Sequence, residues 1–165
     1  MIVSHGRPQT KHFFREQTVP AVSLEQFAGD WFVQGHTHLW IDRNKPDQLE
    51  NYTILNPSQI EVNFSFQKRN KRAHFQQKAW VADPQTNAHW HIQFVYPFWS
   101  DYLIVGLDPE YQWTLVSVPN RSLMWIMTRE KNISSAEYDQ LLQEFREKGY
   151  PIEKICRVKQ SGEEP

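Results

Sequence analysis

Histidines are the residues whose spacing most directly suggests chemistry in this chain. They form two His-x-His pairs, His36/His38 and His89/His91. Side chains at i and i+2 of a β-strand point to the same face, so each pair could offer two imidazoles to a metal ion. No third ligand follows at motif spacing, and His89 and His91 oppose an apolar face. We therefore interpret both pairs as surface histidines and expect no metal or other cofactor.

Other reactive groups point away from catalysis. The single cysteine, Cys156, has no neighbouring base in the sequence and is expected to be a quiet, half-buried thiol. The chain contains neither a glycine-rich phosphate loop nor a serine elbow. The basic run at 68–72 could touch acidic lipid head groups or nucleic acid, yet without interleaved aromatic residues it is typical of a solvated turn. These features predict a protein that is not an enzyme.

Composition favours a β-rich domain with an aromatic interior. The chain has 165 residues, about the size of one domain, with 7 Trp, 6 Tyr and 10 Phe. Its net charge of −1 gives no overall electrostatic attraction to nucleic acid or to an acidic membrane, and we expect no nucleic-acid partner. No apolar run is long enough for a signal-peptide core or a membrane span, so we expect the chain as it stands to be soluble.

Strand-like segments separated by short turns fill most of the chain. The expected strands are 31–41, 49–55, 59–67, 73–82, 88–96, 102–107, 113–118 and 123–129. Their short connections predict antiparallel neighbours. The longer polar break at 42–48 is where an entrance or a lid would lie.

Alternation of apolar and polar side chains indicates that one face of the sheet is shielded from water. Val62, Phe64 and Phe66 share one face of the third strand, and Trp90 and Ile92 share one face of the fifth. Successive strands of this kind suit an up-and-down barrel, whose closure removes both sheet edges. A two-sheet sandwich is the rival architecture, and the short hairpins favour the barrel.

A helix follows the last of these strands. Ser134 and Glu137 form a capping-box pattern, and the helix ends at Gly149 with Pro151 beyond it. Its apolar stripe is expected to pack on the outside of the barrel, and residues 153–158 could add a short closing strand. We divide the chain into an irregular N-terminal arm (1–22), a barrel with its helix (23–160) and a flexible tail (161–165).

Three separated clusters together resemble the lipocalin family, specifically its bacterial and apolipoprotein-D-like branch. They are Gly29-Asp30-Trp31 at the first strand, Leu107-Asp108-Pro109-Glu110-Tyr111 between the sixth and seventh, and Leu123–Arg129 at the last. Their order and spacing match the family over roughly residues 23–160. The resemblance implies an eight-stranded antiparallel up-and-down β-barrel with one C-terminal α-helix packed outside.

The same resemblance implies structural roles for the motif residues. In similar proteins the arginine that ends the last strand packs over the tryptophan of Gly-x-Trp as a cation–π contact. We expect its remaining donors to bind backbone carbonyls at the closed end. The structural motif residues are Gly29, Trp31, Asp108, Tyr111 and Arg129.

A barrel of this size is just wide enough to hold one small ligand. The predicted lining is apolar and aromatic, which favours an acyl chain, and the bacterial members that the chain resembles bind fatty acids and lysophospholipids. Arg43 and Lys45 could face the head group. The predicted ligand-binding residues are Val62, Phe64, Phe75, Trp90, Ile92, Phe94, Tyr102, Trp125 and Met127, with Ile104 as a further inward-facing residue.

One departure from the family pattern affects the first strand. Relatives usually continue Gly-x-Trp with Tyr-Glu-Ile-Ala, whereas this chain has Phe32-Val33-Gln34-Gly35. The lining contributed by this strand is therefore changed, and Gly35 indicates a bulge or a bend.

The function expected from these observations is binding, storage or transport of a small hydrophobic ligand. The alternatives are a tetrapyrrole-binding barrel or redox carrier, with His74 as the candidate haem ligand, and an interaction scaffold with a filled lumen. The resemblance suggests the bacterial cell envelope, in the periplasm or at the outer membrane. It is compatible with peripheral membrane contact and with a monomer or a homodimer.

Overall fold

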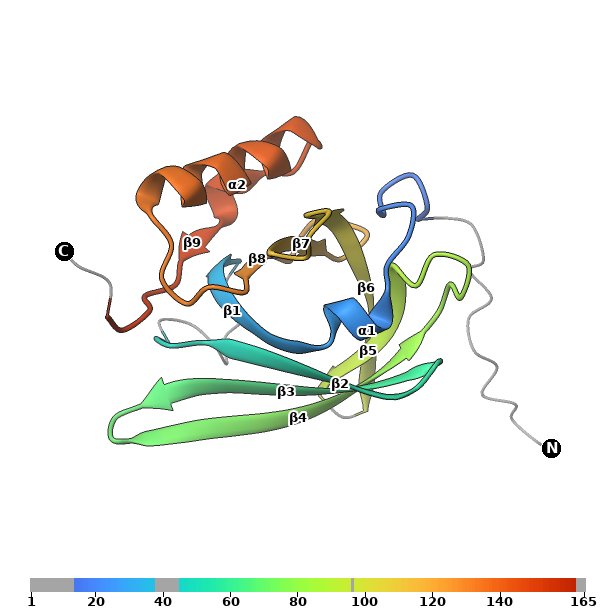
Figure 1. The fold of residues 1–165 in the computed structure, drawn as a ribbon, viewed down its shortest axis with the longest axis horizontal. Helices are drawn as coiled ribbons and strands as arrows, with labels where there is room; N and C mark the ends of the chain where they lie inside the picture. Colours follow the sequence, from blue (N-terminus) through green and yellow to red (C-terminus); the bar gives the residue numbers. More distant parts are fainter. Residues whose placement is uncertain (1–13, 38–44, 96, 163–165) are drawn as a thin grey trace.

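The computed structural model describes residues 14–37, 45–95 and 97–162, and its centre is a closed β-barrel (Figure 1). The strands pair in the order β2-β3-β4-β5-β6-β7-β8-β1-β9, and β2 also pairs with β1, which closes the sheet. All pairings are antiparallel. The expected eight-stranded up-and-down barrel is thus confirmed, with β9 as an extra strand beside β1.

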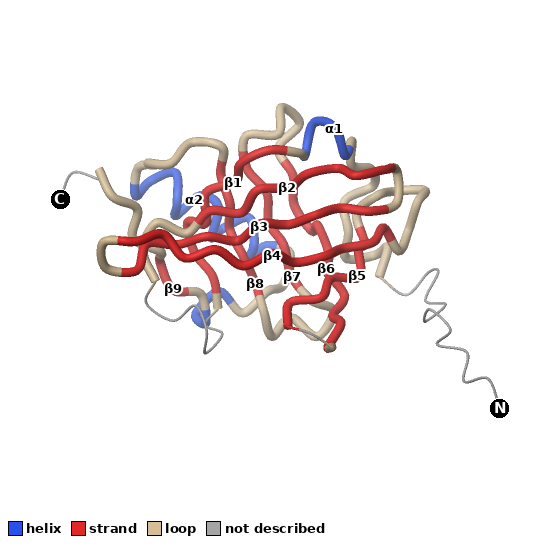
Figure 2. The backbone as a smooth tube through the Cα atoms, turned by 90° about the horizontal axis from the view of Figure 1, so that it is seen from below, coloured by secondary structure: helices blue, strands red, loops and turns tan. Residues whose placement is uncertain are grey.

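The strands lie close to the expected segments. Their bounds are β1 Gly29–His36, β2 Leu49–Asn56, β3 Gln59–Lys68, β4 Lys71–Val81, β5 His89–Val95, β6 Phe98–Leu107, β7 Trp113–Ser117, β8 Met124–Thr128 and β9 Cys156–Arg157. β6 begins four residues earlier than expected, because Phe98 already pairs with Val95 across a tight hairpin. Residues 38–41 of the expected first strand lie outside the described residues. Figure 2 shows the β3–β4 hairpin projecting beyond its neighbours.

The helices take up the outside and one end of the barrel. They are α1 Leu24–Phe27, α2 Ser135–Glu147 and the 3₁₀ turn η1 Ile152–Lys154. The α2 helix starts with the expected capping box between Ser134 and Glu137. Among the helices in the described part of the chain, none is long and apolar enough to span a membrane.

Alternation along the strands produces two separate cores. Inward side chains form one core inside the barrel, and outward side chains of β6, β7 and β8 form a second core with α2. Figure 1 shows α2 on the outside of the barrel. Leu115 and Ile126 face Leu141 and Phe145 of the helix within this second core. The helix therefore covers one outer face of the barrel and leaves β3, β4 and β5 uncovered by it.

Gly35 provides the bend expected in the first strand. The β1–β8 register shifts between Val33 and Gly35. A Cβ atom at Gly35 would lie 2.5 Å from the hydroxyl oxygen of Tyr138. The bulge thus brings the backbone of β1 close to α2, and only glycine fits at this approach.

Arg129 closes one end of the barrel through Trp31. The Arg129 guanidinium carbon lies 3.8 Å from the centre of the Trp31 ring. Its nitrogens donate to the carbonyls of Asp30 (2.8 Å), Gln26 (2.6 Å), Phe27 (3.2 Å) and Tyr111 (3.2 Å). One side chain therefore joins the end of β8 to α1, to the start of β1 and to the β6–β7 turn.

Gly29 and Tyr111 shape the backbone around this contact. Gly29 has a φ of 98°, and a Cβ atom there would lie 3.4 Å from Nη1 of Arg129. Tyr111 also has a positive φ, and its hydroxyl accepts a hydrogen bond from the Ser23 amide at 2.8 Å. The Asp108 carboxylate accepts from the Gln112 amide at 3.1 Å, which fixes the same turn.

Replacing Arg129 should destabilise the barrel without redirecting its fold. We expect Arg129→Ala to lower the free energy of unfolding by about 2 kcal/mol, because charge-assisted hydrogen bonds and the cation–π contact are lost together. Arg129→Lys should lose less, since it keeps the charge but not the planar fork. Urea unfolding measures both, with Arg146→Ala on the exposed face of α2 as the control. A loss below about 0.5 kcal/mol for Arg129→Ala would contradict this role.

Candidate ligand-binding site

The predicted lining residues project from the inner face of five strands. Cross-strand pairing joins Phe64 to Phe75 and Trp90 to Tyr102, and both pairs share the parity of buried interior residues. Val62, Ile92 and Met127 belong to the interior core, and so do Trp90, Tyr102, Ile104 and Trp125. The residues differ in height along the barrel, and this difference separates two layers.

The lower layer is a packed set of rings that we call the aromatic floor. Its members are fully buried: Phe27, Trp31, Tyr52, Trp90 and Tyr102. Trp90 and Tyr102 stack with ring centres 5.0 Å apart and planes 5° apart, and Phe27 meets Trp90 edge-on at 5.4 Å. Trp90 and Tyr102 therefore fill the closed half of the barrel, and only their upper surfaces could meet a ligand.

The upper layer, which we call the upper wall, is less uniformly buried, since Phe64 and Trp125 are buried and Phe75 is exposed. It consists of Phe64, Phe75, Phe94 and Trp125. Phe94 stacks on Trp125 at 5.7 Å, and Trp125 contacts Tyr102 of the aromatic floor at 6.4 Å. Phe75 shares the inner face with Phe64, yet it is 47% exposed. Water therefore reaches the Phe75 ring on the inner face.

A buried carboxylate and two phenols lie at the level of the floor. The Tyr52 hydroxyl donates to the Glu50 carboxylate, and the Tyr102 hydroxyl lies 2.6 Å from the Tyr52 oxygen. Since the Tyr52 proton is used toward Glu50, Tyr102 is the donor in the second bond. Burial raises the pKa of both phenols well above the usual value, so they remain neutral donors.

Sequence reasoning overlooked Glu50 and Tyr52 as interior residues. Glu50, Tyr52 and Ile54 share one parity of β2, and the β1–β2 register pairs Glu50 with the buried Trp31. The sequence of β2 does alternate between inward and outward residues, but a charged residue such as Glu50 at an inward position does not suggest a buried face. Gln77, the cross-strand partner of Val62, is a second polar residue on the inner face that sequence reasoning did not single out.

Two cations lie near the upper wall, on opposite faces of the β3–β4 hairpin. Lys45 Nζ lies 5.6 Å from the ring centre of Phe66, whose ring stacks on Phe75 at 5.9 Å. The Arg72 guanidinium donates to the Ser65 hydroxyl at 3.0 Å and to the Asp47 carbonyl at 2.9 Å. Ser65 and Arg72 share the outward parity of His74, so Arg72 lies on the outer face of the β3–β4 hairpin, whereas Lys45 lies beside the inward-facing Phe66. Arg43, the other predicted head-group residue, lies outside the described residues.

The histidines are placed differently from the expectation of surface residues. His36 is buried, with Nδ1 2.7 Å from the Thr37 carbonyl and Nε2 3.0 Å from the Gln48 amide. His89 is also buried, and with His91 it contacts Asp101 on the next strand. The interpretation as surface histidines is wrong for His36 and His89, and a third potential ligand does lie nearby. Cross-strand contacts cannot be read from spacing along one strand.

Two further expectations concern His38 and His74. His38 lies outside the described residues. His74 pairs with Ser65, on the face of β4 opposite Phe75, and it is exposed. The expectation that His74 could ligate a haem inside the barrel is therefore wrong, because the strand's parity directs this residue outward.

Comparison with known sequences points to one family. The sequence model described as "Lipocalin-like domain" matches residues 22–160. The chain is 34% identical to the outer membrane lipoprotein Blc of Citrobacter freundii, over 84% of this chain and 79% of that protein. It is 27% identical to temperature-induced lipocalin-1 of Arabidopsis thaliana, over 90% of this chain and 85% of the relative.

Solved structures agree on the fold. Insecticyanin from the tobacco hornworm Manduca sexta superimposes with a TM-score of 0.68 at 13% identity, covering 88% of this chain and 85% of that one. Lobster apocrustacyanin A1 gives a TM-score of 0.65 at 13% identity, covering 84% and 79%. With the Gly-x-Trp motif, the arginine-capped floor and the closed barrel, these matches show that the chain belongs to the lipocalin family.

Proposed function

We propose that the protein binds one lipid with a long acyl chain and an anionic head group, a fatty acid or a lysophospholipid, in the upper half of the barrel. The observation that carries this proposal is the water-accessible, inward-facing Phe75 above a fully buried floor. Lipocalins are in general ligand-binding carriers, and the upper wall is suited to a hydrophobic ligand. The protein then acts by reversible occupancy, as a carrier or a scavenger, with no chemical step.

The chemistry of the floor favours the methyl end of the ligand at the bottom. The hydroxyls of Tyr52 and Tyr102 are satisfied by one another and by Glu50, so the floor demands no polar atom from the ligand. Above it, Phe94 and Trp125 offer aromatic area, and each buried methylene contributes about 0.8 kcal/mol. A hydrocarbon chain is the ligand group that uses such a wall best.

Lys45 favours an anionic head group at the open end. Its ammonium lies 5.6 Å from the ring centre of the inward-facing Phe66, which stacks on Phe75 of the upper wall. A carboxylate or a phosphate placed there keeps water on one side while it pairs with a cation. The ligand orientation that we propose is therefore head outward and tail toward the floor.

The relatives favour a cell-envelope location. The proteins from Citrobacter freundii and Vibrio cholerae are named outer membrane lipoproteins. We infer that this chain also works in the cell envelope, where fatty acids and lysophospholipids are present.

Truncating the upper wall should weaken lipid binding. We expect the double variant Phe75→Ala/Phe94→Ala to bind a fluorescent fatty acid about tenfold more weakly, because two rings that would cover the chain are removed. Leu55→Ala is the matched control, since Leu55 is 53% exposed on β2 near the closed end. Fluorescence titration of delipidated protein measures the affinities. Equal affinity in the double variant and the control, or no binding by the wild type, would contradict the proposal and favour a filled lumen.

Removing Lys45 should reduce the preference for an anionic head group. The wild type should bind a fatty acid more tightly than the alcohol of the same chain length, and Lys45→Ala should lower affinity for the acid by about two- to fivefold, as expected for an exposed ion pair. Affinity for the alcohol should not change. Lys154→Ala, an exposed lysine of η1, is the control. Competition titrations give these values, and equal binding of acid and alcohol by the wild type would rule out a head-group role for Lys45.

A further inference from the structure

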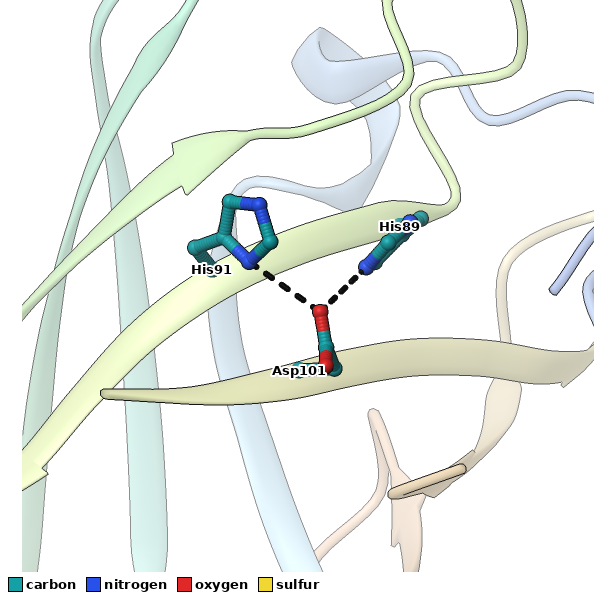
Figure 3. A group of neighbouring side chains, drawn as sticks. All are labelled: His89, His91 and Asp101. Atoms are coloured by element: carbon teal, nitrogen blue, oxygen red, sulfur yellow. Dashed lines mark hydrogen bonds and ion pairs between the residues drawn. The ribbon is translucent and has the colours of Figure 1, made fainter. Parts of the chain in front are cut away.

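A compact cluster of two imidazoles and a carboxylate lies on the outer face of β5 and β6, away from the ligand site. His89 and His91 occupy alternate positions of β5, and Asp101 is the cross-strand partner of His91 on β6. Figure 3 shows both imidazoles directed at the same oxygen of Asp101. The inner faces of these strands carry Trp90 and Tyr102, so the cluster is on the far side of the wall from the floor.

The cluster is tightly converged. His89 Nε2 lies 2.7 Å and His91 Nδ1 lies 3.1 Å from Oδ1 of Asp101. The three potential ligand atoms all lie within 4.8 Å of one another. These bonds hold the pKa of Asp101 well below its usual range, so the carboxylate is ionised.

Aromatic side chains surround the cluster on two sides. The Phe14 ring meets His89 edge-on at 5.3 Å, and the Arg15–Asp83 ion pair, at 2.7 Å, holds the Phe14 segment on the barrel. Trp80 is the cross-strand partner of His91 on β4, and it contacts Trp99 at 4.8 Å. His89 is only 4% exposed, whereas His91 and Asp101 are half-buried. The cluster is therefore partly desolvated and open on the side of His91.

We propose that His89, His91 and Asp101 form a binding site for a divalent transition-metal ion of the zinc type. Two imidazole nitrogens and one carboxylate oxygen make a ligand set that zinc accepts with a fourth position left for water. Metal–ligand bonds of about 2.0–2.2 Å place tetrahedral ligand atoms about 3.3 Å apart, so small outward movements of the side chains admit the ion. The ion takes the place of the hydrogen bonds to Oδ1, and a proton on a coordinating ring nitrogen moves to the other nitrogen of the same ring or to solvent.

Occupancy has a mechanical consequence for the barrel. The three ligands come from neighbouring strands, and the side chains adjacent to them in sequence, Trp90 and Tyr102, form the floor. A bound ion adds a link between β5 and β6 at the level of Trp90 and Tyr102. It binds the folded chain only, because the unfolded chain does not hold β5 beside β6, and so it raises the midpoint of thermal unfolding.

The test is a titration of chelator-treated full-length protein with Zn²⁺ by calorimetry, with Co²⁺ absorption as a second readout of coordination. We expect one ion per chain and an increase in the thermal midpoint with Zn²⁺. His91→Ala and Asp101→Asn should each weaken the binding by at least about tenfold and remove the thermal effect. His74→Ala is the matched control, since it deletes an exposed histidine on the outer face of β4.

The outcomes separate a metal site from a hydrogen-bonded cluster. Tight binding that survives in His74→Ala and is lost in both cluster variants supports the proposal. Binding that is equal in all variants, or no binding by the wild type at millimolar Zn²⁺, overturns it. Circular dichroism verifies that each variant is folded, and Asp101→Asn keeps the side-chain shape where His91→Ala does not. Lipid binding is not involved in any of these measurements.

Discussion

The contact between Arg129 and Trp31 is the constraint on which the rest of the barrel depends. An eight-stranded barrel has two open ends, and an apolar interior needs at least one of them sealed against water. The guanidinium covers the Trp31 ring at 3.8 Å and uses its donors on the carbonyls of α1, β1 and the β6–β7 turn. Polar backbone groups that the closure exposes are thus satisfied by the side chain that covers the ring.

The sealed end explains why the interior has two layers. Phe27, Tyr52, Trp90 and Tyr102 pack above Trp31 almost without exposure. Their polar side-chain atoms are satisfied, because Tyr102 binds Tyr52, Tyr52 donates to Glu50, and the Trp90 indole donates to the Asn87 carbonyl. Towards the other end the packing loosens, and Phe75 is half exposed on the inner face. The two layers thus differ in how completely their rings are shielded from water.

The sequence could predict those parts of the molecule that depend on local pattern. Alternation located the strands, and the spacing of Gly29, Trp31 and Arg129 identified the closed end, because each of these signals lies within one strand or one turn. Inward-facing aromatics followed from the same parity. Depth along the barrel did not, since it depends on how strands are staggered: Trp90 and Trp125 were both predicted to line the site, and Trp90 packs in the floor whereas Trp125 lies in the upper wall.

Two features of the structure could not be predicted from the sequence: the contact of Asp101 with the histidines and the interior position of Glu50. The β5–β6 register shifts between Ile92 and Val95, so counting outward from the hairpin does not bring Asp101 to His91. Glu50 was missed because a carboxylate is not expected against Trp31 unless its phenol partner is known. The Asp101 contact depends on a neighbouring strand, which no spacing rule within a single strand includes. Glu50 and Tyr52 are i, i+2 neighbours on β2, so their spacing was available in the sequence, but their burial against Trp31 was not.

The central claim is that a lipid tail rests on the aromatic floor, and nuclear Overhauser spectroscopy tests it most directly. A fatty acid labelled with ¹³C at its terminal methyl would be bound to the delipidated protein, and contacts from that methyl to ring protons would be recorded. The account predicts contacts to Trp125 and to Trp90 or Tyr102 of the floor, and none to the exposed Phe98. Contacts confined to Phe98 and Trp99 on the surface, or no contact to any buried ring, would contradict it.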